Sequence, residues 1–170
     1  MHKPHIRIII ALCLLGLHAA GCRTARHFPS AEPRAGGDRI VSVERVVDGD
    51  TIKLSSGERV RYIGVDTPEL ARDGRPAEPF AQQAVQCNRD LLGGGPVKLV
   101  FDTEQRDKYG RLLAYVYSGD DYSVFVNREL VRRGCAETLF IAPNTQYALE
   151  FRGLERAARQ AGRGLWAARP

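Results

Sequence analysis

The chain has 170 residues, which is room for one domain with a modest core, and it carries a formal net charge of +5. All four histidines lie at or before His27. A folded domain that begins after them has no histidine, which excludes histidine general bases, Ser-His-Asp triads and histidine-bound zinc. Catalysis in such a domain must use carboxylates, Arg, Lys, Tyr or a hard cation with oxygen ligands.

Residues 1–21 have the pattern of a secretory signal. The basic start MHKPHIR precedes the apolar run IIIALCLLGL, which is too short to cross a bilayer as a mature helix. The following AAGC is similar to a bacterial lipobox, in which Cys22 would be lipid-modified and would anchor the protein to a membrane leaflet. Ala19 stands where a lipobox usually has Leu, so ordinary cleavage without lipidation is the alternative. We expect an exported protein, either lipid-anchored in the bacterial cell envelope or secreted.

Residues 22–39 are rich in small residues, Arg, Pro and Gly and have no apolar periodicity, which predicts a flexible tether. The folded domain is then expected to span residues 40–170. Loss of residues 1–21 removes Lys3 and Arg7 from the 25 basic residues and none of the 20 acidic ones, so the mature chain has a net charge of +3. This charge is compatible with a polyanionic partner but does not require one.

The first part of the domain predicts three antiparallel strands joined by tight turns, at residues 40–47, 51–54 and 59–65. A loop rich in Pro and Gly follows at 66–78. Residues 79–92 then predict a helix, with Pro79 in its first turn. Its apolar residues recur at helical spacing, namely Phe80, Ala84, Cys87 and Leu91.

The second part predicts two further strands, at 97–102 and 111–118, separated by a polar loop. A short extended piece leads into a helix within 124–134, for which Asn127 is a candidate N-cap and Gly134 a candidate C-terminal stop. Residues 144–162 predict a last helix. Its apolar stripe consists of Tyr147, Phe151, Leu154 and Ala158.

Five short strands, with one helix after the third and two at the end, predict an α+β fold that is mainly β. The pattern fits a closed five-stranded barrel of the oligonucleotide-binding (OB) type with three helices, although sandwiches have similar strand signals. Cys87 and Cys135 are the two cysteines of this domain. In an exported protein they predict one disulfide, and two buried free thiols are the alternative.

Two acidic motifs, DGDT and DTPE, lie at strand ends. Either alone is an ordinary turn. We expect the three-stranded meander to bring its first and third strands together, so that Asp50 and Asp66 converge. Two converging carboxylates repel one another unless a cation lies between them, and without histidine a hard cation such as Ca²⁺ or Mg²⁺ is the candidate. The Thr67 carbonyl could add a ligand, and Glu69 could take a proton from water beside the ion.

Basic residues follow the same strands. Arg61 and Asp66 are five residues apart, which puts them on opposite faces of a regular strand unless a bulge near Gly64 or the turn at Asp66 redirects one of them. The segment RDKYGR (106–111) is either a solvated hairpin or a phosphate clamp. In a clamp, the fork of Arg111 would bridge phosphoryl oxygens, Lys108 would add charge, and Tyr109 would stack or donate.

These motifs occur together and in order: VVDGDTIKL, RYIGVDTPE, FDTEQRDKYGRLLAYVY, VNRELVRRGCA and GLW. In this combination the chain resembles the staphylococcal nuclease (thermonuclease) family, from about Ile40 to the C-terminus. The resemblance implies an OB-fold barrel with three helices. It also implies a Ca²⁺-dependent endonuclease that hydrolyses phosphodiester bonds of DNA and RNA and leaves 3′-phosphate ends. We expect such a protein to be a monomer.

The resemblance also implies roles for particular residues. The calcium ligands of the family correspond to Asp50, Asp66 and the Thr67 carbonyl, and its general base corresponds to Glu69. The arginines that hold the scissile phosphate correspond to Arg61 and Arg111. Both Arg61 and Asp66 would then reach the site despite their spacing.

Positions that bind the neighbouring phosphate correspond to Lys108 and Tyr109. One departure is visible in ETLFIAPN (137–144), where Leu139 and Ile141 replace tyrosines that stack on bases. We therefore expect weaker base stacking. The alternatives to a nuclease are a non-catalytic OB-fold nucleic-acid-binding lipoprotein and a protein-binding adaptor. The sequence retains every carboxylate and arginine of the family site, which favours the enzyme.

Overall fold

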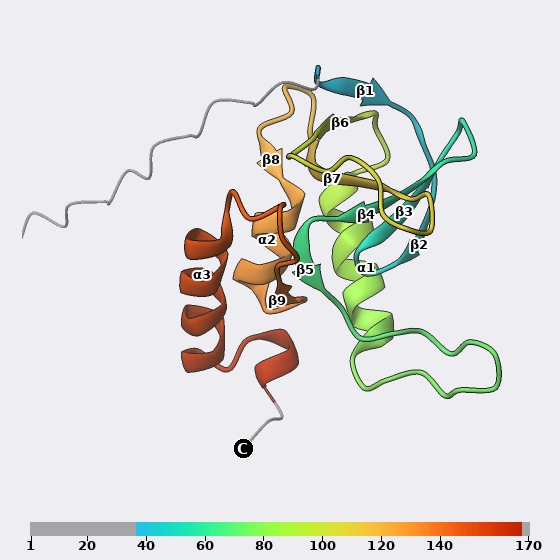
Figure 1. The fold of residues 1–170 in the computed structure, drawn as a ribbon. Coiled ribbons are helices and arrows are strands. Elements are labelled where there is room, and N and C mark those ends of the chain that lie inside the picture. The colour runs from blue at the N-terminus through green and yellow to red at the C-terminus, as the bar shows by residue number, and fades with distance from the viewer. Residues whose placement is uncertain (1–36, 168–170) are drawn as a thin grey trace, which may run out of the picture. The chain divides into compact units, whose positions relative to one another are not determined.

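The computed structural model describes residues 37–167, drawn in colour in Figure 1. The signal segment, Cys22 and nearly all of the predicted tether lie outside the described residues. The strands are β1 (Arg39–Val41), β2 (Val43–Asp48), β3 (Thr51–Leu54), β4 (Arg59–Tyr62), β5 (Gly64–Asp66), β6 (Val97–Val100), β7 (Leu112–Ser118), β8 (Val124–Phe125) and β9 (Glu137–Leu139). The helices are α1 (Ala81–Leu92), α2 (Val126–Arg133), α3 (Ala148–Gln160) and the short 3₁₀ helix η1 (Gly164–Trp166).

The main sheet is mixed and has the strand order β1-β6-β7-β4-β3-β2, with β8 added to β7. Its pairs are antiparallel except for β4 and β7, which run parallel. The predicted meander is present as β2-β3-β4. However, β3 lies between the other two strands, so the expectation that the first and third strands become neighbours is wrong. A three-stranded meander keeps its middle strand in the middle.

The sheet is not closed into a barrel. Only Ser42 separates β1 from β2 in the chain, yet these strands lie at opposite ends of the strand order, and no pairing joins them within residues 37–167. The predicted single strand at 40–47 is therefore divided: β1 pairs with β6, and β2 pairs with β3. The α+β class and the three helices are confirmed, and the closed five-stranded barrel is corrected to an open mixed sheet.

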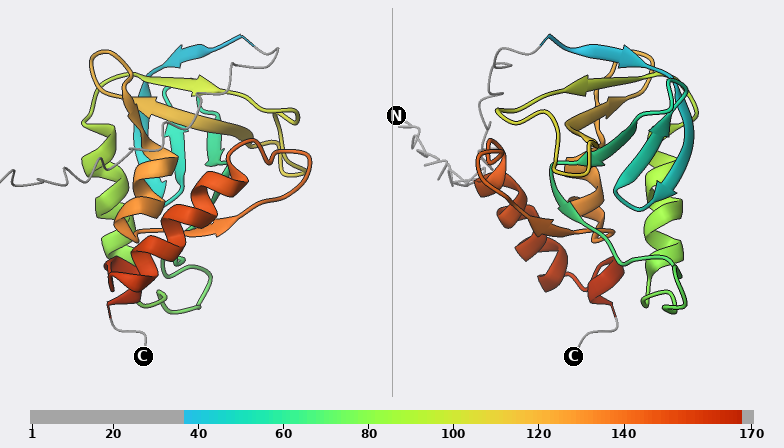
Figure 2. Two further views of the ribbon diagram at one scale, coloured as in Figure 1. Left: turned by 90° about the vertical axis from the view of Figure 1, so that its left-hand side faces the viewer. Right: turned by 45° about the vertical axis from the view of Figure 1, so that its right-hand side comes forward.

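The helices form one layer, in which α2 packs between α1 and α3 (Figures 1 and 2). A long loop between β5 and α1 extends away from this body at the lower right of Figure 1. Gly134 ends α2 in the left-handed conformation, as predicted. None of the helices within residues 37–167 combines the length and the apolar character that crossing a membrane requires.

Two details at the helix starts differ from the sequence-based expectation. Pro79 precedes α1, whose N-cap is Phe80, and therefore does not lie in the first turn. The N-cap position of α2 is Phe125, and Asn127 lies inside the helix. The Asn127 side chain is fully buried, where it accepts a hydrogen bond from the Val116 N–H (2.9 Å) and donates one to the Ile63 carbonyl (2.9 Å). A buried amide needs such partners, and tertiary neighbours supply them.

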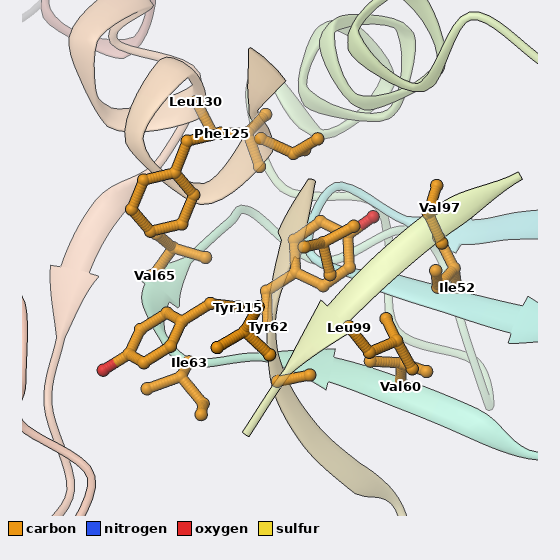
Figure 3. Close-up of a cluster of buried hydrophobic side chains, with 14 of the residues drawn as sticks. Ile52, Val60, Tyr62, Ile63, Val65, Val97, Leu99, Tyr115, Phe125 and Leu130 are labelled. Atoms are coloured by element: carbon orange, nitrogen blue, oxygen red, sulfur yellow. The ribbon is translucent and has the colours of Figure 1, made fainter. Parts of the chain in front are cut away.

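The core fills the space between the sheet and the helices, and Figure 3 shows side chains from strands and from α2 pointing toward one another there. In β4, Val60 and Tyr62 are buried in this core, so the alternate residues Arg59 and Arg61 extend from the opposite face. The predicted helix stripes are confirmed. Their buried members are Ala84, Leu91, Phe151 and Ala158.

Cys87 in α1 and Cys135 just after α2 form a disulfide, with their Cα atoms 6.5 Å apart. Both residues pack against the main core. Of the two alternatives that the sequence left open, the structure therefore contains the disulfide.

Candidate active site

The turn between β2 and β3 packs directly on Thr67. A Cβ atom on Gly49 would lie 2.6 Å from the Thr67 hydroxyl oxygen, so only glycine fits in this turn. The next residue, Asp50, is buried, and its Oδ2 accepts hydrogen bonds from the Thr67 N–H (2.9 Å) and the Thr67 hydroxyl (3.1 Å). The first acidic motif and the second therefore meet at Asp50 and Thr67.

Arg61 connects the two predicted aspartates. Its Nη1 lies 3.2 Å from Asp50 Oδ2, and its Nη2 donates to Asp66 Oδ1 at 2.6 Å. Nη1 also donates to the carbonyls of Tyr62 (3.0 Å) and Val65 (2.6 Å). The chain bends between these residues, at Gly64, where φ is +80°. Strand alternation thus ends at Tyr62, and the redirection near Gly64 brings Arg61 and Asp66 together.

Asp50 and Asp66 share the one guanidinium group of Arg61, and further carboxylates lie near them. Burial raises the pKa of Asp50 to about 7; Arg61 acts in the opposite direction, and the Asp48 carboxylate adds to the rise. Burial also raises the pKa of Asp66 above its ordinary value. There again Arg61 opposes the rise, and Glu137, Glu78 and Asp48 contribute to it.

Sequence reasoning missed these three further carboxylates. Glu137 lies directly opposite Asp66 in the β5–β9 ladder. Residues 137–144 were expected to form a loop, so strand β9 and this pairing were not foreseen. Glu78 belongs to the long loop between β5 and α1. It is held near the start of that loop, because its carboxylate accepts the Glu69 N–H at 3.1 Å. Asp48 belongs to the DGD turn, and its place two residues before Asp50 was the one available signal.

Glu69 follows Pro68 at the start of the long loop and is exposed. Its backbone is tied to Glu78, whose N–H donates to the Glu69 carbonyl at 2.9 Å. Within residues 37–167 the Glu69 carboxylate makes no hydrogen bond or ion pair. The structure thus fixes the Glu69 backbone through Glu78, close in the chain to Thr67. No contact within residues 37–167 joins the Glu69 carboxylate to Arg61, Asp50 or Asp66.

A cavity of about 460 Å³ adjoins the carboxylate cluster, with Arg61 in its wall. The other residues predicted to bind phosphate line the same cavity, namely Lys108, Tyr109 and Arg111. Leu139 and Ile141 also line it, with 42% and 69% of their surfaces exposed. The structure therefore gathers the predicted basic residues around one cavity, together with the two apolar residues that replace tyrosines.

Asp107 organises the loop that carries Arg111, and sequence reasoning did not single it out. Its Oδ1 accepts the N–H groups of Tyr109 (2.9 Å) and Arg111 (3.0 Å), and its Oδ2 accepts Arg111 Nε at 2.7 Å. Burial acts to raise the pKa of Asp107, but the hydrogen bonds from Arg111 and Tyr109 outweigh it and lower the pKa overall. An Asp that opens an Asp-Lys-Tyr-Gly turn is a signal that could have identified it.

The donor atoms at the carboxylate cluster suit a hard cation. Within residues 37–167 there is no group of three or more His, Cys, Asp or Glu side chains placed to hold a metal ion. The predicted ligand set is of another kind, with two carboxylates and one backbone carbonyl. The Thr67 carbonyl accepts no hydrogen bond within the described part of the chain. Oxygen donors and incompletely neutralised carboxylates are the features that Ca²⁺ favours.

Comparison with known proteins assigns the chain to a family. Residues 59–168, more than half of the chain, match the family model described as staphylococcal nuclease homologue. The chain belongs to the staphylococcal nuclease family. The matched region contains Arg61, the second acidic motif and the loop that carries Arg111, so the resemblance inferred from the motifs is confirmed.

Relatives of this staphylococcal nuclease homologue match over most of its length. A thermonuclease of Staphylococcus intermedius is 39% identical over 127 residues, which is 73% of this chain and 74% of the relative. A thermonuclease of Staphylococcus hyicus is 30% identical over 162 residues, or 94% of each protein. Endonuclease YncB of Bacillus subtilis (strain 168) is 39% identical over 131 residues, which is 74% of this chain and 61% of the relative.

Proposed function

We propose that this chain, a nuclease of the staphylococcal nuclease family, is a Ca²⁺-dependent endonuclease that hydrolyses the phosphodiester bonds of DNA and RNA and leaves 3′-phosphate ends. Family membership and relatives named thermonuclease and endonuclease support a nucleic-acid hydrolase. The observation that carries the proposal is the position of Arg61. Its guanidinium pairs with both aspartates and also forms part of the wall of the basic cavity.

In this proposal Asp50, Asp66 and the Thr67 carbonyl hold Ca²⁺. A Ca²⁺ ion held there would supply Lewis-acid chemistry toward a phosphate oxygen and toward water. Glu69 accepts the proton of the attacking water, a role that suits an exposed carboxylate whose atoms have no partner within residues 37–167. Arg61 and Arg111 bind phosphoryl oxygens, and they bind the more negative pentacoordinate transition state better than the substrate.

The loop at residues 106–111 supplies the rest of the phosphate site. Asp107 holds the Nε of Arg111, so the terminal nitrogens of the fork remain available to phosphate. Lys108 adds charge beside it, and the Tyr109 ring, which is 73% exposed, can stack on a base or a ribose. Leu139 and Ile141 offer apolar contact without an aromatic ring, so base stacking at this wall is weaker than tyrosine would provide.

The proposal includes export. Residues 1–21 are the signal, the residues between the signal and β1 are the tether, and Cys22 carries a lipid that attaches a monomeric enzyme to a membrane of the cell envelope. The Cys87–Cys135 disulfide supports an oxidising compartment. The mass of the mature N-terminal peptide tests the anchor: diacylated Cys22 is expected, and an unmodified cysteine would mean simple secretion.

Cleavage of supercoiled plasmid and of single-stranded RNA, with Ca²⁺ or with EGTA, tests the main proposal. We expect nicking and degradation only with Ca²⁺, and fragments whose 3′ ends require a phosphatase before a polymerase extends them. Full activity in EGTA would reject the calcium site. Binding of both nucleic acids without cleavage would favour the non-catalytic OB-fold module.

A further inference from the structure

Arg59 extends the basic face of β4 beyond Arg61. Val60 and Tyr62 are buried, so Arg59 and Arg61 share the other face of the strand, roughly 7 Å apart along it. The parallel register of β4 and β7 pairs Val60 with Leu112. One step back in both strands, Arg59 lies beside Arg111.

A second cavity, of about 630 Å³, opens at this position. It shares Tyr109 and Arg111 with the first cavity, and Arg59 and Arg72 form its other basic walls. Arg59 belongs to β4, whereas Arg72 comes from the long loop between β5 and α1. Gly57 and Gly110 also line it, and a Cβ atom on either would meet nothing within 4 Å, so no side chain fills the opening.

The arginines of this cavity all keep guanidinium nitrogens that make no hydrogen bond within residues 37–167. Arg59 makes no hydrogen bond or ion pair through its side chain with any residue in 37–167. The ion pair of Arg72 with Asp48 is long, at 4.0 Å. Arg111 uses its Nε for Asp107, and its terminal nitrogens have no hydrogen-bond partner within the described residues. Three such groups around one opening suit an anion with several oxygens.

The acidic residue that lines the second cavity is already neutralised. Glu58 Oε1 accepts Arg106 Nη2 at 2.6 Å, and Glu58 Oε2 lies 3.3 Å from Arg39 Nη2. Neither partner lines the cavity. Glu58 therefore does not cancel the positive charge of Arg59 and Arg72.

We propose that Arg59 and Arg72 form an outer phosphate site, which binds a phosphate of the substrate strand at least one nucleotide away from the phosphate held by Arg61 and Arg111. This inference rests on the proposed function, because it places both phosphates on one nucleic acid strand. Tyr109 and Arg111 stand between the two cavities, so a strand would pass over them from one to the other. Phosphate contacts carry no base information, so the outer site favours longer strands of any sequence.

Fluorescence anisotropy with labelled oligothymidylates tests this site. The double variant Arg59→Ala/Arg72→Ala is compared with wild type, using a decanucleotide and a dinucleotide that has a single internal phosphate. The buffer contains EDTA, so that the proposed reaction does not consume the ligand. Arg156→Ala is the matched control, since Arg156 is exposed on α3, has no side-chain partner within residues 37–167 and lines neither cavity.

The double variant is expected to raise the Kd of the decanucleotide about tenfold and to lower the salt slope by about 0.7 for each lost phosphate contact on a single strand. The dinucleotide Kd is expected to change less than about twofold, because its phosphate occupies the inner site. Arg156→Ala is expected to bind both ligands as wild type does. Unchanged melting temperatures would show that the exposed substitutions leave the fold intact.

An unchanged decanucleotide Kd in the double variant would overturn the outer site, as would an equal loss for Arg156→Ala. The Kd of inorganic phosphate is measured as well. If this Kd differs between wild type and the double variant while the Kd of the decanucleotide does not, the cavity binds a free anion and the inference is wrong. Plasmid cleavage by wild type is measured separately, so a failure of catalysis is distinguishable from a failure of the outer site.

Discussion

The guanidinium of Arg61 belongs to both halves of the site. It pairs with Asp50 and Asp66, and it forms part of the cavity wall that also contains Arg111. Several fixed donors are needed for this, because Nη1 and Nη2 contact different groups at the same time. An ammonium group is a compact point charge and could not reproduce that geometry.

The general-base assignment is tested by Glu69→Gln. The amide keeps the size of the side chain but cannot accept a proton from water, so kcat is expected to fall about 100-fold or more while nucleic-acid binding is retained. Plasmid cleavage and anisotropy provide the two measurements. Glu44→Gln is the control, since Glu44 is exposed and lines neither cavity. Normal turnover in Glu69→Gln would remove Glu69 from the mechanism.

Arg111→Lys tests the phosphate fork. Lysine keeps the charge but loses the planar donors and the Nε hydrogen bond to Asp107, so kcat/KM for plasmid is expected to fall about 100-fold. The matched substitution Arg89→Lys, at an exposed position of α1, is expected to have no effect. If both variants retain wild-type kcat/KM, Arg111 acts only through its charge.

At the scale of elements, two glycines determine how the strands meet. Gly64 has a φ of +80°, and a Cβ atom there would lie 2.6 Å from the Phe140 ring, so the bend between β4 and β5 needs glycine. Gly49 allows the β2–β3 turn to reach Thr67. These two close approaches, rather than direct pairing of the first and third strands, bring the acidic motifs together.

Gly49→Ala tests the second of these approaches. The added methyl must displace Thr67, so activity is expected to fall and the free energy of unfolding to drop by about 1–3 kcal/mol. Gly153→Ala is the control, because a Cβ at this helical glycine meets nothing within 4 Å, and it is expected to stabilise α3 by up to about 1 kcal/mol. Thermal unfolding and plasmid cleavage are measured for both. Similar behaviour of the two variants would contradict the packing described at Gly49.

At the scale of the whole molecule, the site is assembled from segments far apart in the chain. Strand β4, the loop before β7 and the segment around β9 line the first cavity. The side chain of Asn144 ties two of these segments together, since it accepts the Glu104 N–H at 2.8 Å and donates to the Glu104 carbonyl at 2.7 Å. The disulfide joins α1 to the end of α2, 48 residues apart in sequence.

Loss of that disulfide is expected to destabilise the whole domain. Closing a loop of this length restricts the unfolded chain, so Cys87→Ala/Cys135→Ala should lower the free energy of unfolding by about 2–4 kcal/mol. Denaturant unfolding with and without reductant measures the effect. Reductant should destabilise wild type and leave the double variant unchanged. Equal sensitivity of the two proteins to reductant would contradict the disulfide.

Much of this arrangement could be predicted from local pattern. The strand alternation of β4, the DGD turn, the α1 and α3 stripes and the glycine that ends α2 all depend on neighbours within a few residues. Asn127 shows where local reasoning fails. Its residue type and position suggested a helix cap, but its partners are Val116 in β7 and Ile63 between β4 and β5. Strand β9 was missed for the same reason, because its pairing partner β5 is far away in sequence.

The sequence by itself determined the family motifs, the absence of histidine after His27 and the alternation that separates Arg59 and Arg61 from the core. Only the tertiary structure decided that the sheet stays open, that Cys87 bonds to Cys135, and that Glu137 lies opposite Asp66. The physical reason is the separation along the chain over which each kind of interaction acts. Turn chemistry and side-chain periodicity act between near neighbours, whereas strand partners, disulfide pairing and local electric fields depend on which distant segments the packed core brings together.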